Sequence, residues 1–359
     1  MGARRARRRL GAKTTALVAS AAIAGLLSAC GSSGAPSAST STVASPSVTV
    51  MTRNMYFGAD LSPLFNATAA QLGPEAAVAY QQMQASDIPD RIQSDAREVA
   101  AAKPDLLALQ EAVVWSKTAS GEATPTVQYD FTSLLLADLS RVGITYRVAS
   151  STDGFSGALP VPDVGLVTLQ DRDVILVRAG SAVTVSGPTS GDYQHALTIN
   201  VAGIPITVKR GWAAVNASIG GRQFRMIATH LEAYSDPTRD AQAQELLSMV
   251  GASSGSTLVL GDINSAAQGA GSQTYDMVRA AGLGDAWASA EGGDAGYTCC
   301  RDADLRGGSL TQRIDMVFYR GQFKATKAEV VGAGGADRTP GGLWPSDHAG
   351  VVASLTVPT

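Results

Sequence analysis

The sequence predicts a mixed α/β fold (α+β) in which two sheets pack face to face and helices cover their outer faces. From Val48 onward, short apolar segments alternate with helical segments, and no internal repeat is visible. The middle of the chain is rich in β-branched residues between Gly-bearing turns, which indicates antiparallel neighbouring strands. Such antiparallel blocks argue against a doubly wound parallel sheet, so two packed sheets are the best layered arrangement.

The first part of this region predicts three strands and two helices. A Pro-containing break at Ile88 divides the first helix, where Asp87 is a candidate cap and Pro89 suits the first helical turn. Pro104 ends this helix, and an apolar strand follows that stops at a glutamate. In order, the predicted elements are strand 47–52, helix 75–103, strand 105–110, helix 131–142 and strand 144–148.

The second part predicts mostly strands, followed by helices that alternate with them. Asp236 is a candidate cap for the helix that begins at Pro237. His195 opens one of these strands and is expected to be structural or to lie at a rim. The predicted elements are strands 174–177, 195–201, 206–209, 213–219 and 223–229, helix 237–250, strand 258–260, helix 273–281, and strands 313–319 and 350–355.

The N-terminal 29 residues resemble a bacterial lipoprotein signal peptide. Six basic residues precede a short apolar run, too short to span a membrane as a helix, which ends in Leu27-Ser28-Ala29-Cys30. The resemblance implies cleavage before Cys30 and a lipid on its thiol, hence export and anchoring to the outer face of the cell membrane, or release from the cell. An ordinary secretory signal with an incidental Cys30 is the alternative, and both the general and the twin-arginine export routes stay open.

Cys30 and the segment to residue 47 form a predicted flexible tether of Gly, Ser, Ala, Thr, Pro and Val, which leaves 48–359 as a single folded domain. Without the signal peptide, 22 basic residues face 31 acidic ones, a net charge of −9. A protein that binds long nucleic acid usually presents a basic face, so this balance argues against that partner.

Two adjacent cysteines remain in the mature chain. Cys299 and Cys300 can form a strained vicinal disulfide or stay as two free thiols, and the sequence does not decide between them. With no further cysteine and three histidines in the whole chain, metal binding by this pair is the least favoured reading.

Polar side chains recur where apolar strands end. Each one has a local explanation, such as a turn, an ion pair or a buried hydrogen-bonded histidine. Together they predict that several strands deliver side chains to one point, as a sheet edge allows. The set comprises Asn54, Glu111, His230, Asp262, Asn264, Asp315, Asp347 and His348.

The chemistry of this set suits hydrolysis of a phosphate ester. Carboxylates such as Glu111 and Asp262 are hard oxygen donors that suit Mg²⁺ or Mn²⁺ rather than zinc. A divalent ion neutralises a phosphate, amide donors hold its oxygens, and an oriented base activates water.

Six motifs in this order resemble the endonuclease/exonuclease/phosphatase superfamily, which includes deoxyribonuclease I-like nucleases, neutral sphingomyelinases and inositol polyphosphate 5-phosphatases. Each motif alone is weak, but the ordered set covers nearly the whole mature chain. The resemblance implies a four-layered sandwich. The motifs are Arg53-Asn54-Met55, Leu109-Gln110-Glu111, Thr229-His230-Leu231-Glu232, Gly261-Asp262-Ile263-Asn264, Arg313-Ile314-Asp315-Met316-Val317 and Ser346-Asp347-His348.

The resemblance also implies a role for each motif residue. Asn54 and Glu111 would hold the divalent metal, with Glu111 as the direct ligand and Asp347 near it. Asp262 would position or deprotonate the attacking water, and Asn264 would contact the phosphate.

Three histidine and aspartate roles complete this set. His348, oriented by Asp315, would act as base or as phosphate donor; whether Asp262 or His348 is the base stays open. His230 would stabilise the transition state or assist the leaving group.

One further element bears on the substrate. Lys209-Arg210-Gly211-Trp212 resembles a segment of the sphingomyelinase-like branch and makes Arg210 a candidate phosphate contact, although a turn with a packed Trp212 explains it equally well. We therefore expect a monomeric, lipid-anchored phosphodiesterase that acts on a lipid headgroup or another small phosphodiester. The alternatives are a secreted Mg²⁺-dependent nuclease, whose substrate is nucleic acid, and a non-enzymatic surface-binding lipoprotein.

Overall fold

The computed structural model describes residues 45–359 except 66, 270, 272, 292–293 and 358–359. The predicted signal peptide, Cys30 and most of the predicted tether therefore lie outside the described residues. Among the helices of the described part, none is long and apolar enough to cross a membrane.

The first sheet has eight strands and is built around β1, which is antiparallel to β16 and parallel to β2. β5 pairs with β6 outside the linear order of the other strands. In spatial order the sheet runs β15 (Lys324–Val331), β16 (Gly350–Thr356), β1 (Ser47–Asn54), β2 (Leu106–Gln110), β6 (Gly165–Arg178), β3 (Val114–Thr118) and β4 (Thr126–Asp130), with β5 spanning Tyr146–Val161.

The second sheet has six strands, and a separate two-stranded hairpin follows its edge strand β7 in the chain. Within this sheet β11 and β12 are parallel, and their neighbours are antiparallel. The order is β13 (Gly284–Asp285), β14 (Asp315–Arg320), β12 (Ser256–Asp262), β11 (Arg222–His230), β10 (Gly211–Ile219) and β7 (Thr184–Asp192), and the hairpin is β8 (Leu197–Val201) with β9 (Ile204–Val208).

The layers follow from the alternation of side chains along the strands. In β2, Leu106 and Ala108 join the core between the two sheets, whereas Leu107 and Leu109 join the core beneath the helices. The helices over the first sheet are α2 (Ala69–Ala85), α3 (Ile88–Ala102) and α4 (Phe131–Arg141). Those over the second sheet are α5 (Asp236–Ala252) and α6 (Gln273–Ala280).

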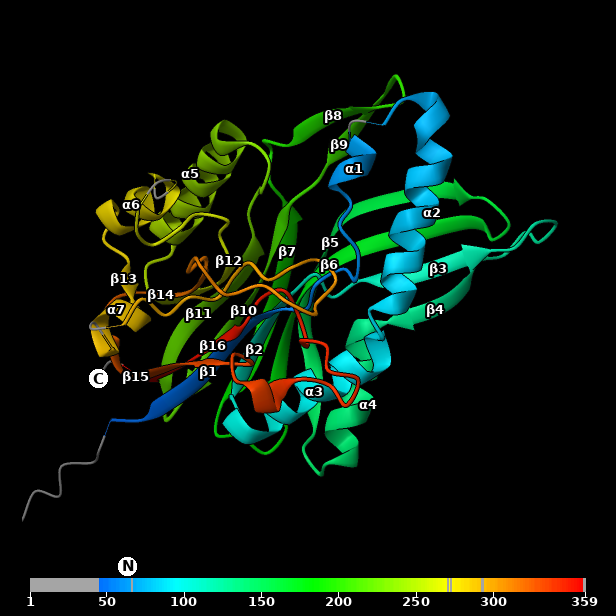
Figure 1. Ribbon diagram of the computed structural model, residues 1–359. Coiled ribbons are helices and arrows are strands. Elements are labelled where there is room, and N and C mark those ends of the chain that lie inside the picture. The colour runs from blue at the N-terminus through cyan, green and yellow to red at the C-terminus, as the bar shows by residue number, and fades with distance from the viewer. Residues whose placement is uncertain (1–44, 66, 270, 272, 292–293, 358–359) are drawn as a thin grey trace, which may run out of the picture. The chain divides into compact units, whose positions relative to one another are not determined.

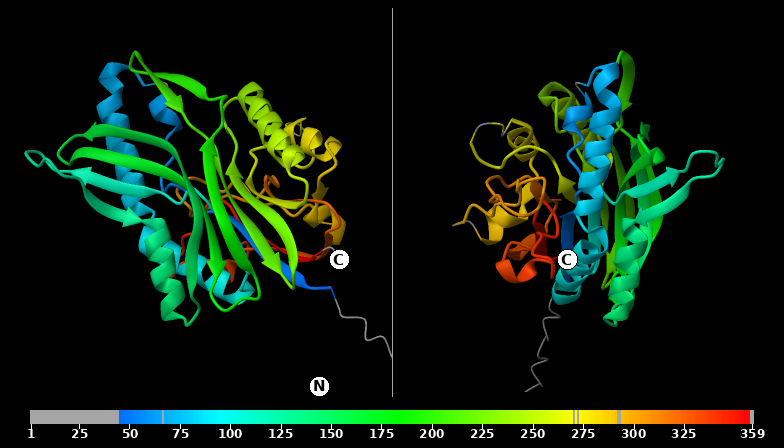
Figure 2. Two further views of the ribbon diagram at one scale, coloured as in Figure 1. Left: turned by 180° about the vertical axis from the view of Figure 1, so that it is seen from behind. Right: turned by 45° about the vertical axis from the view of Figure 1, so that its right-hand side comes forward.

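Figures 1 and 2 show the helices on the two outer sides and the strands between them. The predicted sandwich is therefore confirmed. The short elements α1 (Ser62–Phe65), α7 (Ala286–Ala290) and the 3₁₀ turn Gly335–Asp337 lie in connections.

Several local predictions were wrong. Asp87 sits at the start of α3 with a left-handed backbone (φ 49°) and its side chain caps nothing. The cap of α5 is Ser235, whose side chain accepts from the amide of Thr238, and Asp236 is the first helical residue. His195 precedes β8 and does not open it; its exposed ring contacts Glu245 of α5.

Candidate active site

The registers of the two sheets place the predicted polar residues at one edge. Parallel pairing sets Asn54 beside Gln110, so that Glu111 follows immediately. In the second sheet His230 pairs with Asp262, and Asp262 pairs with Asp315. A cavity of about 200 Å³ opens at this edge. Its lining includes Glu111, Arg210, His230, Asp262, Asn264, Asp347 and His348.

Asn54 connects the two sheets at the base of this cavity. Its side-chain amide donates to Glu111 Oε1 (3.0 Å) and to Asp262 Oδ2 (3.1 Å), and its carbonyl accepts from the Tyr56 amide (3.0 Å). Glu111 has a left-handed backbone (φ 54°), and its second oxygen accepts from the Phe57 amide (2.7 Å). Asn54 is thus placed to hold two carboxylates in position.

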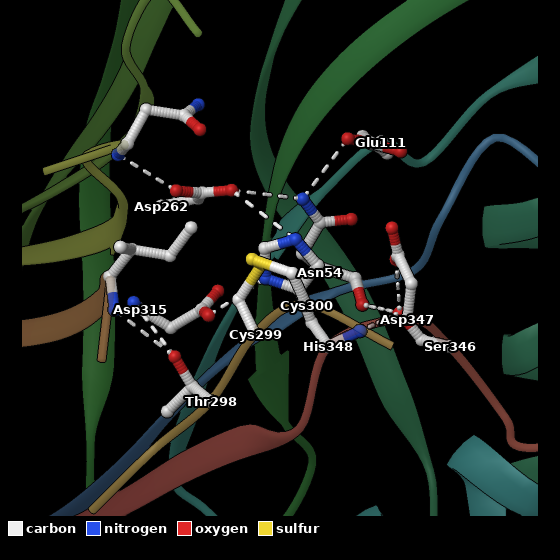
Figure 3. Close-up of a disulfide and its surroundings, with 12 residues drawn as sticks. Asn54, Glu111, Asp262, Thr298, Cys299, Cys300, Asp315, Ser346, Asp347 and His348 are labelled. Carbon is white, nitrogen blue, oxygen red and sulfur yellow. Dashed lines mark hydrogen bonds and ion pairs between the residues drawn. A yellow bond between two sulfur atoms is a disulfide. The ribbon is translucent and has the colours of Figure 1, made fainter. Parts of the chain in front are cut away.

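His348 and Asp315 form a buried pair (Figure 3). The Nδ1 of His348 lies 2.8 Å from Asp315 Oδ2, and its Nε2 lies 3.7 Å from Asp262 Oδ2. The backbone carbonyl of His348 accepts from Arg53 Nη1 (2.8 Å). Although burial lowers the pKa of His348, the neighbouring carboxylates of Asp315, Asp347 and Asp262 outweigh it and hold that pKa well above its usual range.

A vicinal disulfide lies beside this pair. Cys299 and Cys300 are bonded, so the structure contains the disulfide that the sequence left undecided. The backbone of Cys299 forms isolated bridges with His348 and with Gln312. The Thr298 hydroxyl accepts from the amides of Ile314 and Asp315, both at 3.2 Å. This segment therefore contacts both members of the pair.

His230 is held on the opposite side of Asp262. Arg210 Nη1 donates to His230 Nδ1 (3.0 Å), and His230 Nε2 lies 3.6 Å from Asp262 Oδ2. Burial, together with the positive charges of Arg210 and His348, lowers the pKa of His230 well below its usual range. An arginine can only donate, so Nδ1 accepts, and Nε2 lies 3.1 Å from the side-chain amide nitrogen of Asn264.

Asn264 lies next to His230 in the same cavity wall. Its backbone is left-handed (φ 50°), its amide N–H donates to Asp262 Oδ1 (2.8 Å), and its side-chain amide donates to the Leu231 carbonyl (2.9 Å). The structure thus brings the side chains of His230, Asp262 and Asn264 together.

Arg210 is buried in the cavity wall. It lies 3.6 Å from Asp171 and 3.7 Å from Glu232. Its charge compensates buried carboxylates, and whether it also touches a phosphate stays a prediction. Trp212 lies half-buried in β10, beside the core under α5.

Two buried carboxylates of the site are missing from the predicted set. Asp171 and Asp173 lie two residues apart in β6, and both are buried. Burial raises the pKa of Asp171 to about 6, and burial with the neighbouring Asp171 charge raises that of Asp173 well above its usual range. The D-x-D spacing next to the apolar segment 174–177 was the available signal, but the predicted strand began only at Val174.

The charge balance of the cavity fits a divalent cation. Burial and the carboxylates of Asp347 and Asp171 raise the pKa of Glu111 to about 8, and burial and Asp315 raise that of Asp262 to about 6. Burial also raises the pKa of Asp347. Neighbouring buried carboxylates repel one another when all of them are ionised. A hard cation that prefers oxygen ligands removes this repulsion and stabilises their ionised form.

A second grouping of possible ligands lies close by. Asp262, Asp315 and His348 present ligand atoms within 4.8 Å of one another. The Nδ1 of His348 is already engaged with Asp315, which explains this proximity without a metal. That Glu111 is the direct metal ligand, with Asp347 near the metal, stays a prediction.

The comparisons with known proteins agree with this geometry. The model of the endonuclease/exonuclease/phosphatase family matches residues 78–348. No individually curated protein matches the chain. Many solved structures match the chain, among them three whose sequence identities are so low that they show the fold alone.

An endonuclease/exonuclease/phosphatase family protein of Bacteroides thetaiotaomicron has a TM-score of 0.54 and 18% identity, covering 88% of this chain and 99% of that chain. Humanized D. rerio TDP2 has a TM-score of 0.53 and 14% identity, covering 86% and 98%. A mannosyl-6-phosphatase of B. thetaiotaomicron has a TM-score of 0.51 and 18% identity, covering 86% and 99%. Since the family model spans most of the folded domain, this chain belongs to the endonuclease/exonuclease/phosphatase family.

Proposed function

We propose that this chain is an exported, lipid-anchored, Mg²⁺- or Mn²⁺-dependent phosphodiesterase that acts on a lipid headgroup or another small phosphodiester. The observation that carries the proposal is the cavity in which three carboxylates (Glu111, Asp262 and Asp347) converge with His230 and His348. Carboxylates supply a hard metal site, and imidazoles supply proton donors toward a phosphate.

The geometry supports Asp262 as the base. With a pKa of about 6, its carboxylate is ionised at neutral pH and can take a proton from water. His348 has a raised pKa and is an imidazolium at neutral pH, so its Nε2 is a donor to a phosphate oxygen rather than a base. Asp315 holds the other ring nitrogen and fixes the orientation of the ring.

His230 and Asn264 supply neutral donors on the other side of Asp262. Arg210 donates to Nδ1 of His230, and Nε2 of this ring lies on the Asp262 side of the cavity, 3.6 Å from Asp262 Oδ2 and 3.1 Å from the side-chain nitrogen of Asn264. An N–H aimed at the position where negative charge develops stabilises the transition state without first reorganising.

Glu111, with Asp347 close to it, would hold the metal, and Asn54 keeps Glu111 in place through its side-chain amide. The ion would neutralise the charge of the phosphate and polarise its P–O bonds, which makes the phosphorus more open to attack by water.

The substrate class rests on three features of the chain. The mature chain carries a net charge of −9, the N-terminus resembles a lipoprotein signal, and the Arg210 segment resembles that of sphingomyelinases. A mannosyl-6-phosphatase with the same fold makes phosphomonoesters a class to include in the test.

The test is a substrate panel with and without EDTA: bis-p-nitrophenyl phosphate, p-nitrophenyl phosphate, sphingomyelin, inositol phosphates and plasmid DNA. We expect metal-dependent cleavage of the diester and the lipid, and loss of both in Glu111→Gln and His348→Ala. Near-normal activity of His348→Ala would contradict the assigned roles. Salt-sensitive cleavage of plasmid DNA alone would establish the nuclease alternative, and no cleavage with Mg²⁺ or Mn²⁺ would support the non-enzymatic one.

A further inference from the structure

A second cavity adjoins the acidic one and is lined by apolar side chains. Its volume is about 140 Å³. Its walls come from α1 and α2 on one side, from β3, β5 and β6 beneath, and from the β8–β9 hairpin at the end. Figure 1 shows this hairpin beside α1 and α2. Among the described residues that line this cavity there is no Asp, Glu, Lys, Arg or His, so they offer no charge to a ligand.

The two cavities share part of their walls. Leu61, Phe65 and Phe155 line both the apolar cavity and the one that contains Glu111, Asp262 and His348. The Trp115 indole, another wall of the apolar cavity, donates to the Phe57 carbonyl at the rim of the acidic one (2.9 Å). The two cavities are therefore neighbours that meet at these shared side chains.

Exposed apolar side chains surround these walls. Tyr234 is 54% exposed and packs edge-on against Phe65, with ring centroids 5.0 Å apart. Ile204, at the start of β9, is 59% exposed and pairs with Val201, which lines the apolar cavity. Exposed apolar groups of this kind mark ligand-binding or membrane-facing surfaces.

We propose that the apolar cavity binds an alkyl chain of an amphiphilic phosphodiester whose phosphate lies in the acidic cavity. This inference rests on the proposed phosphodiesterase function and narrows its substrate to esters with an aliphatic substituent. A cavity of about 150 Å³ lined by aliphatic and aromatic side chains holds one benzene molecule, so about six carbons fit here. Filling it removes apolar surface of both partners from water and restores packing contacts that an empty cavity lacks.

The test is a series of alkyl p-nitrophenyl phosphates (methyl, butyl, hexyl and decyl) below their micelle-forming concentrations. All four carry the same phosphate and the same leaving group, so chain length is the sole variable. Burial of one methylene group raises kcat/KM by about fourfold at most. We expect kcat/KM to rise at least about tenfold from the methyl to the hexyl ester and then to level off. Equal kcat/KM values across the series would overturn the inference while leaving the proposed function intact.

Two variants and one control locate the effect. Ala79→Phe on α2 fills the apolar cavity, and Leu159→Trp on β5 does so from a half-buried position. The control is Val78→Phe, because Val78 neighbours Ala79 on α2 and is 57% exposed. We expect both filling variants to lower the hexyl value to the methyl value, while the control keeps the difference. A chain-length preference that persists in both filling variants would refute the site.

A binding measurement separates this inference from the catalytic proposal. With Mg²⁺ present, 6-bromohexyl phosphate should quench tryptophan fluorescence through Trp115, whereas 2-bromoethyl phosphate should not reach it. Quenching that is lost in Ala79→Phe and kept in Val78→Phe supports the cavity even if every ester, methyl included, resists hydrolysis. Absence of quenching together with absence of hydrolysis would overturn both proposals.

Discussion

The Nδ1 atom of His348 lies 2.8 Å from Asp315 Oδ2, with both side chains buried. Asp315 begins β14 in the second sheet, whereas His348 precedes β16 in the first sheet. The pair therefore exists only when the two sheets are packed together. A carboxylate in this position fixes the ring and keeps it protonated, which links the packing of the fold to the chemistry of the site.

Asp315→Asn should reduce kcat by on the order of 10²–10⁴-fold, because the amide keeps the shape but loses the charge that holds the His348 proton. The pKa of His348 should fall, so the loss of activity at high pH should begin at a lower pH than in the native enzyme. A pH–rate profile of kcat/KM checks both effects. The matched control is Asp163→Asn, an exposed turn residue, which should leave the profile unchanged. An unshifted profile in Asp315→Asn would contradict the donor role of His348.

Mg²⁺ should stabilise the protein more at pH 8 than at pH 6. Burial and neighbouring carboxylates raise the pKa of Glu111 from 4.5 to about 8, so the metal-free folded state holds a proton that the unfolded chain releases at a lower pH. The free energy of unfolding of the metal-free protein therefore falls as pH rises across this window. A cation that replaces the proton offsets this loss.

The measurement is the Tm gain on adding Mg²⁺, taken at both pH values. Glu111→Gln should abolish most of the gain. An equal gain at both pH values, or a full gain in Glu111→Gln, would place the metal elsewhere.

Thr298→Val should lower both stability and kcat. The valine side chain has the same shape, but it leaves the buried amides of Ile314 and Asp315 without the acceptor that the hydroxyl provides. We expect a loss of about 1–3 kcal/mol in the free energy of unfolding, measured by urea denaturation. Thr298→Ser keeps the acceptor and should restore kcat. If the serine variant behaves like the valine variant, this hydroxyl does not position Asp315.

Asp171→Asn and Asp173→Asn should differ in their effect on stability at pH 7. Among the described residues Asp173 Oδ1 has no hydrogen-bond partner, and burial with the neighbouring Asp171 charge raises the pKa of Asp173, so an amide there should cost less stability than the same change at Asp171. Asp171 lies 3.6 Å from the buried Arg210. Its replacement should lower the free energy of unfolding by about 3 kcal/mol, which is the lower end for breaking a buried ion pair, because Glu232 still faces Arg210. Urea denaturation of both variants measures the difference, and equal losses would contradict it.

The sequence alone predicted most of the site because its residues stand where apolar strands end. The composition of four strands shows that they are buried, and a polar residue stands at the end of each. Such a residue lies at the edge of the sheet, where the buried strand ends. These residues are Asn54, Glu111, His230 and Asp262. It did not predict Asp171 and Asp173, because they lie inside β6 rather than after it. Polar residues within a strand normally indicate a solvent-facing side, and here that side faces the cavity.

Local periodicity thus determined the fold class from the sequence, and strand-end chemistry predicted which residues meet in the acidic cavity. The tertiary structure decided the contacts between segments far apart in the chain: the Asp315–His348 pair, the bridge from Cys299 to His348, and the apolar cavity beside the acidic one. These contacts depend on how the two sheets, the first two helices and the β8–β9 hairpin pack. Packing is a relation between distant segments, and local sequence patterns carry no information about it.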